Sequence, residues 1–378
     1  MYIIWYTFNM EILLALFYFF YFSVVGVYVI FMPKVLYMLG YSASEVGIIF
    51  SAAPLVRFVV PFLFMQGLEL NRRVFNGALI ILIVSALSFY LSIESFYKLL
   101  FSNIFLGVGL SLILPYVELA SLEKVGKQHY GKIRLFGSIG FILVALILVK
   151  LLSTPTVALN FLFVLTSITA IVAFFIAQKE SMQKREKHSG DASINILQDW
   201  KLWAGFILMQ MSFGSFYNFF TIYSTHNGIS LDMTIYLWSF GVIVEIIMLF
   251  FQARLLKNNL LTLLQFTTLM TAFRWFLVFE YADNIEMLFF TQSIHALSFA
   301  LFHSAAISYL FELYKQKSLA QQLFLGLSYG LGALLGALIA GYMYEFYPTY
   351  LFASSALMAF AAFLFLRAFS NQCSKKLP

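Results

Sequence analysis

Charged residues are scarce in this chain of 378 residues, because only 11% are Asp, Glu, Lys or Arg while 62% are apolar. A soluble domain carries roughly 25% charged residues, and the mean hydropathy here is +0.89. No water-soluble fold can bury that much apolar surface, so lipid must be the solvent for most of the chain. We therefore expect the lipid bilayer, and no nucleic acid, as the partner of this surface despite the formal charge of +6.

Cysteine is almost absent as well. The single Cys373 has no partner in the chain, which excludes an intramolecular disulfide and a thiolate metal site. The sequence also has no His-Glu-x-x-His motif, which a helix-borne zinc hydrolase would need. These absences disfavour an enzyme, and we expect no catalytic residue, no metal and no cofactor.

Long apolar runs fill most of the sequence. A bilayer core about 30 Å thick is crossed by roughly 20 helical residues, and runs of that length without two-residue alternation exclude a β-barrel. The runs predict an all-α polytopic membrane protein with twelve transmembrane helices, at residues 11–32, 45–66, 74–93, 98–119, 134–153, 157–178, 202–225, 234–253, 260–280, 286–308, 321–344 and 349–369.

The basic residues divide unequally between the two sides that these spans define. Of the 23 Lys and Arg, the side opposite the N-terminus has only Lys34, Lys98 and Lys150. Three more fall inside spans, namely Arg57, Arg134 and Arg274. All the others lie on the side of the N-terminus. This excess of Lys and Arg predicts that the side of the N-terminus is cytoplasmic. Both termini then lie in the cytoplasm, as in a bacterial inner-membrane protein.

The longest polar stretch divides the chain into two similar parts. We expect an N-terminal six-helix bundle at 1–178, a cytoplasmic linker at 179–201 and a C-terminal six-helix bundle at 202–378. Gly40-Tyr-Ser42, before span two, matches Gly228-Ile-Ser230, before span eight. Two pseudo-symmetric halves of like topology are the plan of the major facilitator superfamily, whose substrates bind near the bilayer midplane between the halves.

Five ionisable residues lie well inside the predicted spans: Arg57, Glu245, Arg274, His295 and His303. An ionisable group at the bilayer centre costs at least about 2.5–3.5 kcal/mol and is kept there when it is paired or reached by water. Glu245, Arg274, His295 and His303 fall on spans eight, nine and ten, and we interpret them as a proton-coupling cluster. The alternative is a static Glu245–Arg274 pair, with each histidine as an interhelical hydrogen-bonding residue.

Other residues are candidates for substrate binding. Glu118 ends span four and Arg134 opens span five, where Arg134 can hold an anion by charge-assisted hydrogen bonds; both can instead reach water by snorkelling. Arg57 is a second candidate anion ligand. Tyr217 and Asn218 lie within the aromatic stretch 216–220, which predicts an aromatic lining for a substrate cavity. Aromatic residues are also common on surfaces that face lipid or the membrane interface.

These motifs together resemble a known family. Residues 134–140 (RLFGSIG), preceded by 130–132 (YGK), are similar to the span-five signature of the phenylpropionate permease family, which related nucleoside:proton symporters share. Further similarities are Arg57, 237–245 (LWSFGVIVE), 273–275 (FRW), and His295 with Phe299 and His303. The resemblance runs over nearly the whole chain and implies a proton-coupled carrier of 3-phenylpropionate-like acids.

The family is also similar to lactose permease. The resemblance implies that Glu245, Arg274 and His295 correspond to that permease's proton-coupling acid, arginine and histidine, and that Glu118 and Arg134 correspond to its sugar-binding acid and arginine. One departure is Ser298, which stands where the permease has a further acid.

The sequence thus predicts a secondary active transporter, working as a monomer by alternating access, that imports a small organic anion with protons. Aromatic acids such as phenylpropionate-like anions are one candidate class of substrate. A proton-antiport exporter is the alternative within transport. A receptor or assembly factor on a transporter scaffold is the alternative of another class.

Overall fold

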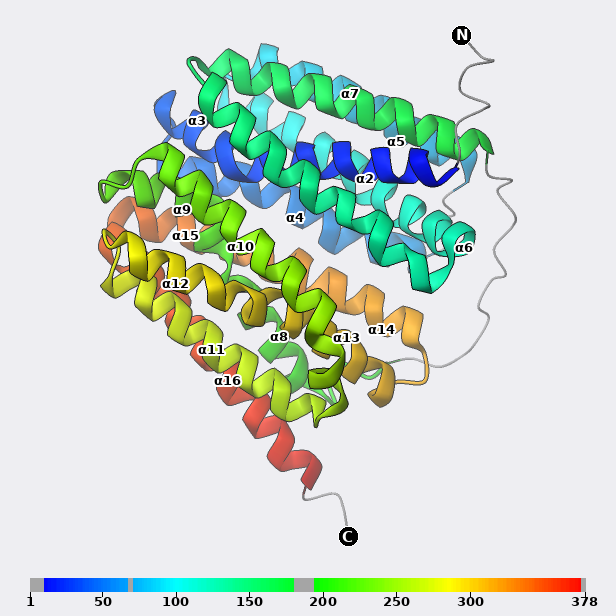
Figure 1. Ribbon diagram of the computed structural model, residues 1–378, viewed down its shortest axis with the longest axis vertical. Helices are drawn as coiled ribbons and strands as arrows, with labels where there is room; N and C mark the ends of the chain where they lie inside the picture. Colours follow the sequence, from blue (N-terminus) through cyan, green and yellow to red (C-terminus); the bar gives the residue numbers. More distant parts are fainter. Residues whose placement is uncertain (1–9, 67–70, 180–193, 375–378) are drawn as a thin grey trace. The chain divides into compact units, whose positions relative to one another are not determined.

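The computed structural model describes residues 10–66, 71–179 and 194–374. Of the predicted linker, residues 180–193 lie outside the described residues. The described residues are helical apart from short turns and contain no strand, which confirms the all-α prediction. Figure 1 labels the helices, and the described residues divide into two compact units, the first within 10–41 and 62–179 and the second within 42–61 and 194–374.

The first unit contains four long helical segments. They are α2 (Met10–Gly26), continued by η1 (Val27–Phe31) and α3 (Met32–Met38), then α5 (Arg72–Ser92), α6 (Phe96–Leu151) and α7 (Pro155–Lys179). Two predicted spans lie in α6, one at Phe96–Glu118 and one at Tyr130–Leu151. The residues between these spans are helical too, so the connection is not an irregular loop.

The second unit holds the remaining helices. They are α4 (Ala43–Met65, as far as Pro61), α8 (Trp200–Ser212), α9 (Gly214–His226), α10 (Leu231–Phe251), η2 (Gln252–Lys257), α11 (Leu260–Glu280), α12 (Ile285–His295), η3 (Ala296–Leu301), α13 (Phe302–Leu313), α14 (Lys317–Phe324), η4 (Leu325–Gly332), α15 (Ala333–Phe346), η5 (Pro348–Tyr350) and α16 (Leu351–Ser374).

The described residues form 11 helices that are long and apolar enough to cross a membrane. The predicted span seven is not among them because its helix breaks at Phe213 into α8 and α9, of 13 residues each. Kinks are common at Gly and Ser, and Phe213 stands between Ser212 and Gly214. Gly214 also touches the Gly336 backbone so closely that a side chain would not fit. Twelve spans therefore remain compatible with the fold.

The two similar turns of the sequence have the same local structure. Gly40 and Gly228 have positive φ angles of 95° and 86°, which suit glycine because it has no Cβ. After each glycine a backbone N–H reaches back to a carbonyl, from Tyr41 to Leu36 at 3.2 Å and from Ile229 to Ser224 at 3.0 Å. The resemblance of the two halves thus extends to helix-ending geometry.

Helix α4 joins the second unit although it comes early in the chain. Its packing against α15 depends on small residues, because a Cβ on Gly47 would lie 2.7 Å from the Ala337 carbonyl oxygen. The Glu345 carboxylate accepts a hydrogen bond of 2.7 Å from the Ser44 backbone N–H in the first turn of α4. The compact units therefore do not follow chain order, and the predicted bundles 1–178 and 202–378 stay a prediction.

Candidate functional site

Arg274 on α11 is the centre of a buried polar cluster in the second unit. Its side chain is fully buried. Its Nη1 lies 2.9 Å from His295 Nδ1 and donates to Ser298 Oγ at 3.2 Å, while Nη2 donates to Gln292 Oε1 at 3.0 Å. All three partners belong to span ten, so one guanidinium ties α11 to α12 and η3.

The Arg274 contact determines which nitrogen of His295 carries a proton. A guanidinium has only donors, so His295 Nδ1 must accept and is unprotonated. The imidazole is therefore neutral with its proton on Nε2. That nitrogen lies 3.7 Å from Glu245 Oε2 on α10, which is longer than a hydrogen bond but close enough for the two groups to interact electrostatically. The structure thus brings Glu245, His295 and Arg274 together in one chain of contacts.

Aromatic rings surround the buried guanidinium. The Arg274 Cζ lies 4.2 Å from the Trp275 ring centroid and 4.6 Å from that of Phe216. Stacking on aromatic faces stabilises a desolvated cation by about 2 kcal/mol. The His295 ring stacks on Phe299 at 5.4 Å with planes 5° apart. These rings hold the charged groups in a site with little access to water.

His303 lies on the same span but has a different partner. Its Nδ1 is 2.8 Å from the Tyr329 hydroxyl in η4, and it packs against Phe324. The structure therefore places His303 beside Tyr329, whereas His295 contacts Arg274 and Glu245 directly.

Tyr217 and Asn218 on α9 have different surroundings. The Tyr217 ring stacks on Phe213 at 5.6 Å and on Trp238 at 6.4 Å. Asn218 donates from Nδ2 to the Gly214 carbonyl at 2.8 Å, so its amide nitrogen is bonded within its own helix. Arg57 on α4 is exposed, and it interacts electrostatically with Tyr217.

Glu118 and Arg134 form a second cluster, in the first unit. The Arg134 Nε lies 3.9 Å from Glu118 Oε1, with about a third of each side chain exposed. Tyr130 donates to the same carboxylate oxygen at 3.4 Å. The Arg134 guanidinium covers the Phe22 ring at 3.9 Å and the Tyr18 ring at 5.4 Å. A loosely paired arginine held by aromatic faces is available to an anion.

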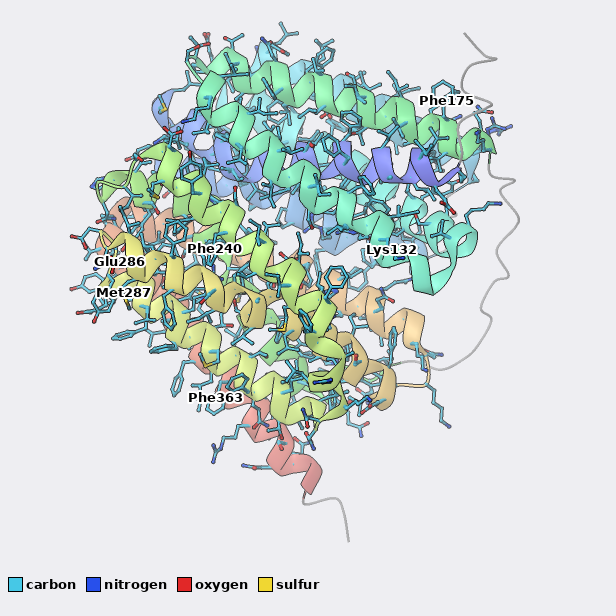
Figure 2. All side chains as sticks on the ribbon, viewed as in Figure 1. Lys132, Phe175, Phe240, Glu286, Met287 and Phe363 are labelled. Atoms are coloured by element: carbon cyan, nitrogen blue, oxygen red, sulfur yellow. The ribbon has the colours of Figure 1, made fainter. Side chains whose placement is uncertain are left out.

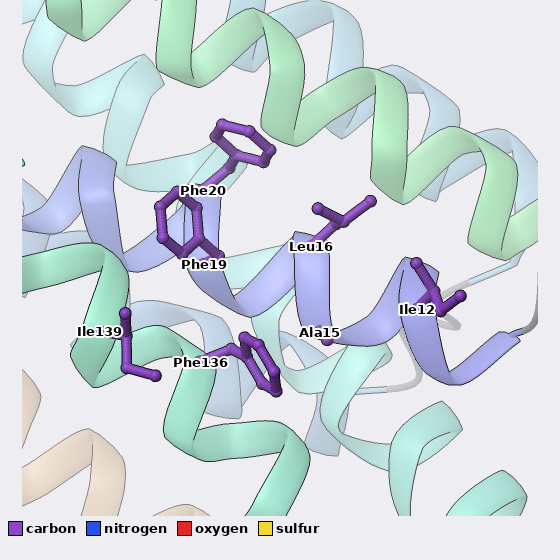
Figure 3. Close-up of a pocket in the computed structure, with 7 residues that line it drawn as sticks. All are labelled: Ile12, Ala15, Leu16, Phe19, Phe20, Phe136 and Ile139. Atoms are coloured by element: carbon purple, nitrogen blue, oxygen red, sulfur yellow. The ribbon is translucent and has the colours of Figure 1, made fainter. Parts of the chain in front are cut away.

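An apolar recess of ≈ 380 Å³ lies between α2 and the second half of α6 (Figure 3). Its lining consists of Ile12, Ala15, Leu16, Phe19, Phe20, Phe136 and Ile139. None of the predicted site residues lines this recess.

One hydrolase-like sequence motif lies in the second unit, in a structural context that differs from that of hydrolases. The pattern Gly-x-Ser-x-Gly occurs at 326–330, but it needs a strand-to-helix turn to expose its serine. Here it lies in the π-helical segment η4, and Ser328 is buried. Groups of three or more His, Cys, Asp or Glu close enough to hold a metal are also missing from the described residues.

Sequence reasoning missed several residues of these clusters. Gln292 is fully buried and accepts a hydrogen bond from Arg274, and the contact of Ser298 with the same guanidinium was not predicted either. Both are three residues from His295, which is one helical turn, and this spacing was the available signal. Tyr329 gave no such signal, because its approach to His303 depends on the packing of spans ten and eleven.

The fold and the buried charges together define a polytopic helical membrane protein of the transporter type. Residues 11–354 match the model of the MFS_1 like family, so the chain belongs to this family. It is accordingly a multi-pass, non-enzymatic transporter of the major facilitator type, embedded in a membrane and acting on a small molecule.

Similar proteins include two bacterial transporters. A "Probable 3-phenylpropionic acid transporter" of Escherichia coli (strain K12) is 23% identical over 94% of this chain and 96% of that protein. The "Uncharacterized transporter YwbF" of Bacillus subtilis (strain 168) is 25% identical over 81% of this chain and 79% of that protein. The resemblance to this permease family expected from the motifs is thereby confirmed.

Solved structures show the same fold. The nucleoside transporter NupG has a TM-score of 0.76 at 15% identity and covers 96% of this chain and 99% of its own. The human organic anion transporter MFSD10 has a TM-score of 0.66 at 15% identity, with coverages of 94% and 98%. At such identities the likeness concerns architecture alone.

Proposed function

We propose that the protein is a proton symporter that imports a small organic anion, with an aromatic acid as the favoured substrate class. The observation that carries this proposal is the buried chain of contacts from Arg274 through neutral His295 to Glu245. It joins a permanent cation to a carboxylate that can be protonated, through an imidazole of defined tautomer.

Proton and substrate binding are coupled through the charge of this cluster. An ionised Glu245 opposes the positive charge of Arg274 across the His295 ring. When Glu245 takes up a proton, that negative charge disappears and the cluster becomes more positive, which favours an anionic substrate. Because linkage is reciprocal, the bound anion in turn favours the protonated carboxyl group. His303 is proposed as a further proton-handling residue.

The anion itself is proposed to bind to arginines and aromatic rings. Arg134 and Arg57 are proposed to orient its carboxylate, and Glu118 competes with that carboxylate for Arg134. Tyr217, stacked between Phe213 and Trp238, and Asn218 are proposed to contact its organic part. The naming of the Escherichia coli relative as a 3-phenylpropionic acid transporter supports an aromatic acid.

Localisation and assembly belong to the same proposal. The excess of basic residues on one side favours a bacterial inner membrane with both termini in the cytoplasm. We propose that a monomer carries out alternating access. Transport assays in right-side-out and inverted vesicles measure direction, and import in the first kind of vesicle separates the symporter from an exporter.

The test of coupling replaces Glu245 by Gln, which keeps the size of the side chain and removes its titration. Glu245→Gln should abolish accumulation of substrate driven by a proton gradient while sparing counterflow exchange, which needs no net proton movement. Glu286→Gln is the matched control, because Glu286 is an exposed acid at the first turn of α12 (Figure 2). Native-level accumulation by Glu245→Gln would refute the proposed coupling.

A further inference from the structure

Two π-helical segments bring Tyr329 and His303 into contact. His303 follows η3 (Ala296–Leu301), and Tyr329 lies within η4 (Leu325–Gly332). Their polar atoms, Tyr329 Oη and His303 Nδ1, are 2.8 Å apart. Single π-helical turns are frequent at functional sites because they redirect side chains. Here two of them, on spans ten and eleven, direct one hydroxyl and one imidazole towards each other.

The turn in η3 also changes the relation of the two histidines. Eight residues of regular α-helix would set His295 and His303 about 80° apart around the axis. A π-helical turn takes up one extra residue. The two histidines are then related as residues seven positions apart in an α-helix, whose directions around the helix axis differ by about 20°. Helix geometry therefore places both positions near one face of the span, separated by about 10 Å along it.

Tyr329 interacts with both the second histidine, by direct contact, and the acid of the buried cluster, through the field of its charge. Its hydroxyl interacts electrostatically with Glu245 and with Arg57. Close packing of η4 on α4 maintains this position, because a Cβ on Gly330 would lie 2.6 Å from the Phe58 Cα. A tyrosine hydroxyl both donates and accepts hydrogen bonds, which is what a relay between two titrating groups requires.

We propose that Tyr329 passes the coupled proton from Glu245 to His303, towards the cytoplasmic end of span ten. The step rests on the proposed symport. The Glu245 carboxyl proton moves, directly or across one water molecule, to the Tyr329 oxygen as the tyrosine's own proton moves to His303 Nδ1. Glu245 becomes a carboxylate, Tyr329 stays neutral and His303 becomes an imidazolium. The imidazolium then releases its Nε2 proton to cytoplasmic water.

The competing role for Tyr329 is a structural hydrogen bond between spans ten and eleven. The two roles differ in what the hydroxyl supports. A relay is needed only for net proton transfer, whereas a structural bond supports every transport mode. Counterflow exchange in the absence of a proton gradient therefore separates them.

The experiment compares Tyr329→Phe, His303→Gln and the double variant in proteoliposomes with 3-phenylpropionate as the probe. Tyr309→Phe is the matched control, since it removes a tyrosine hydroxyl from span ten, which also carries His303, on a ring that packs against Phe369. Substrate-driven proton uptake is followed with a pH-sensitive dye, and counterflow with labelled probe. The relay predicts a loss of proton uptake of at least about tenfold in both single variants, with counterflow within about twofold of native.

The double variant should be no slower than either single variant, because two groups in series act as one unit. Native proton uptake by Tyr329→Phe overturns the relay, and so does an equal loss of counterflow and proton uptake. Glu245→Gln is run in parallel to keep the two proposals separate. If it remains coupled the symport proposal fails, whereas if it uncouples and Tyr329→Phe does not, the relay alone fails.

Discussion

Gln292 provides the sharpest test of how the buried Arg274 charge is held. Gln292→Leu removes the acceptor of the 3.0 Å bond from Arg274 Nη2 and keeps a similar volume. Among the described residues, Arg274 Nε already has no hydrogen-bond partner, so the variant leaves two donors of one buried cation unsatisfied. The side chain of Gln292 is fully buried, and water cannot easily replace the lost acceptor.

The expected loss of stability follows from the energies of hydrogen bonds in soluble proteins and in membrane proteins. A hydrogen bond to a charged group contributes about 1.5–3 kcal/mol in soluble proteins, while interhelical bonds in a membrane protein average about 0.6 and reach about 1.7 kcal/mol. We therefore expect Gln292→Leu to lower the free energy of unfolding by about 1–2 kcal/mol. For a unit of this size that corresponds to a fall in Tm of about 2–8 °C.

Thermal unfolding of the purified protein in detergent measures this fall. Gln265→Leu is the matched control, because its amide makes only a 3.4 Å bond to the Leu366 carbonyl on α16 and has no charged partner. The control should lose less than half as much. A Tm for Gln292→Leu at or above that of the native protein would refute the reasoning, since Arg274 would then not depend on this acceptor.

Three further predictions concern other contacts. Arg274→Lys should keep the positive charge but lose the forked donors of the guanidinium, so proton-driven accumulation of substrate should fall at least about tenfold. Arg254→Lys changes an exposed arginine and should accumulate substrate at the native level. Gly47→Leu should lower the Tm, because its Cβ would lie 2.7 Å from the Ala337 oxygen; an unchanged Tm would contradict the α4–α15 packing. Outside the membrane spans, burial raises the pKa of Tyr314, which donates to Asp199 at 2.7 Å. A raised pKa means that the folded state keeps its proton longer, so stability should decline above about pH 10, and Tyr314→Phe should lessen that decline in Tm measured against pH.

The approximate positions of most spans could be predicted from hydropathy, because lipid requires about 20 apolar helical residues whatever the neighbouring helices are. The starts of three helices also have a local cause, which the sequence analysis did not use. Ser230, Asn259 and Asn284 accept hydrogen bonds from the first turns of α10, α11 and α12, as residues at the helix N-cap commonly do. The exception is span seven, where contact between Gly214 and Gly336 accompanies a break that hydropathy does not reveal.

The candidate site was partly predictable for an energetic reason. A charge inside a span needs a partner, so Glu245, Arg274 and His295 stood out by depth alone, and the structure brings them together. The nature of their contacts did not follow from depth. Arg274 Nη1 lies 2.9 Å from His295 Nδ1, and the other ring nitrogen of His295 lies 3.7 Å from Glu245. That geometry depends on the rotamers of side chains from three packed helices.

Composition and hydropathy by themselves determined that this chain is a helical membrane protein with buried charges, because transfer into lipid is a property of each segment alone. Tertiary structure decided that α4 packs with the second unit, that π-helical segments interrupt spans ten and eleven, and that Gln292 and Tyr329 complete the polar contacts. Those features arise from close packing between helices distant in sequence, where glycine backbones and side-chain directions determine which atoms meet.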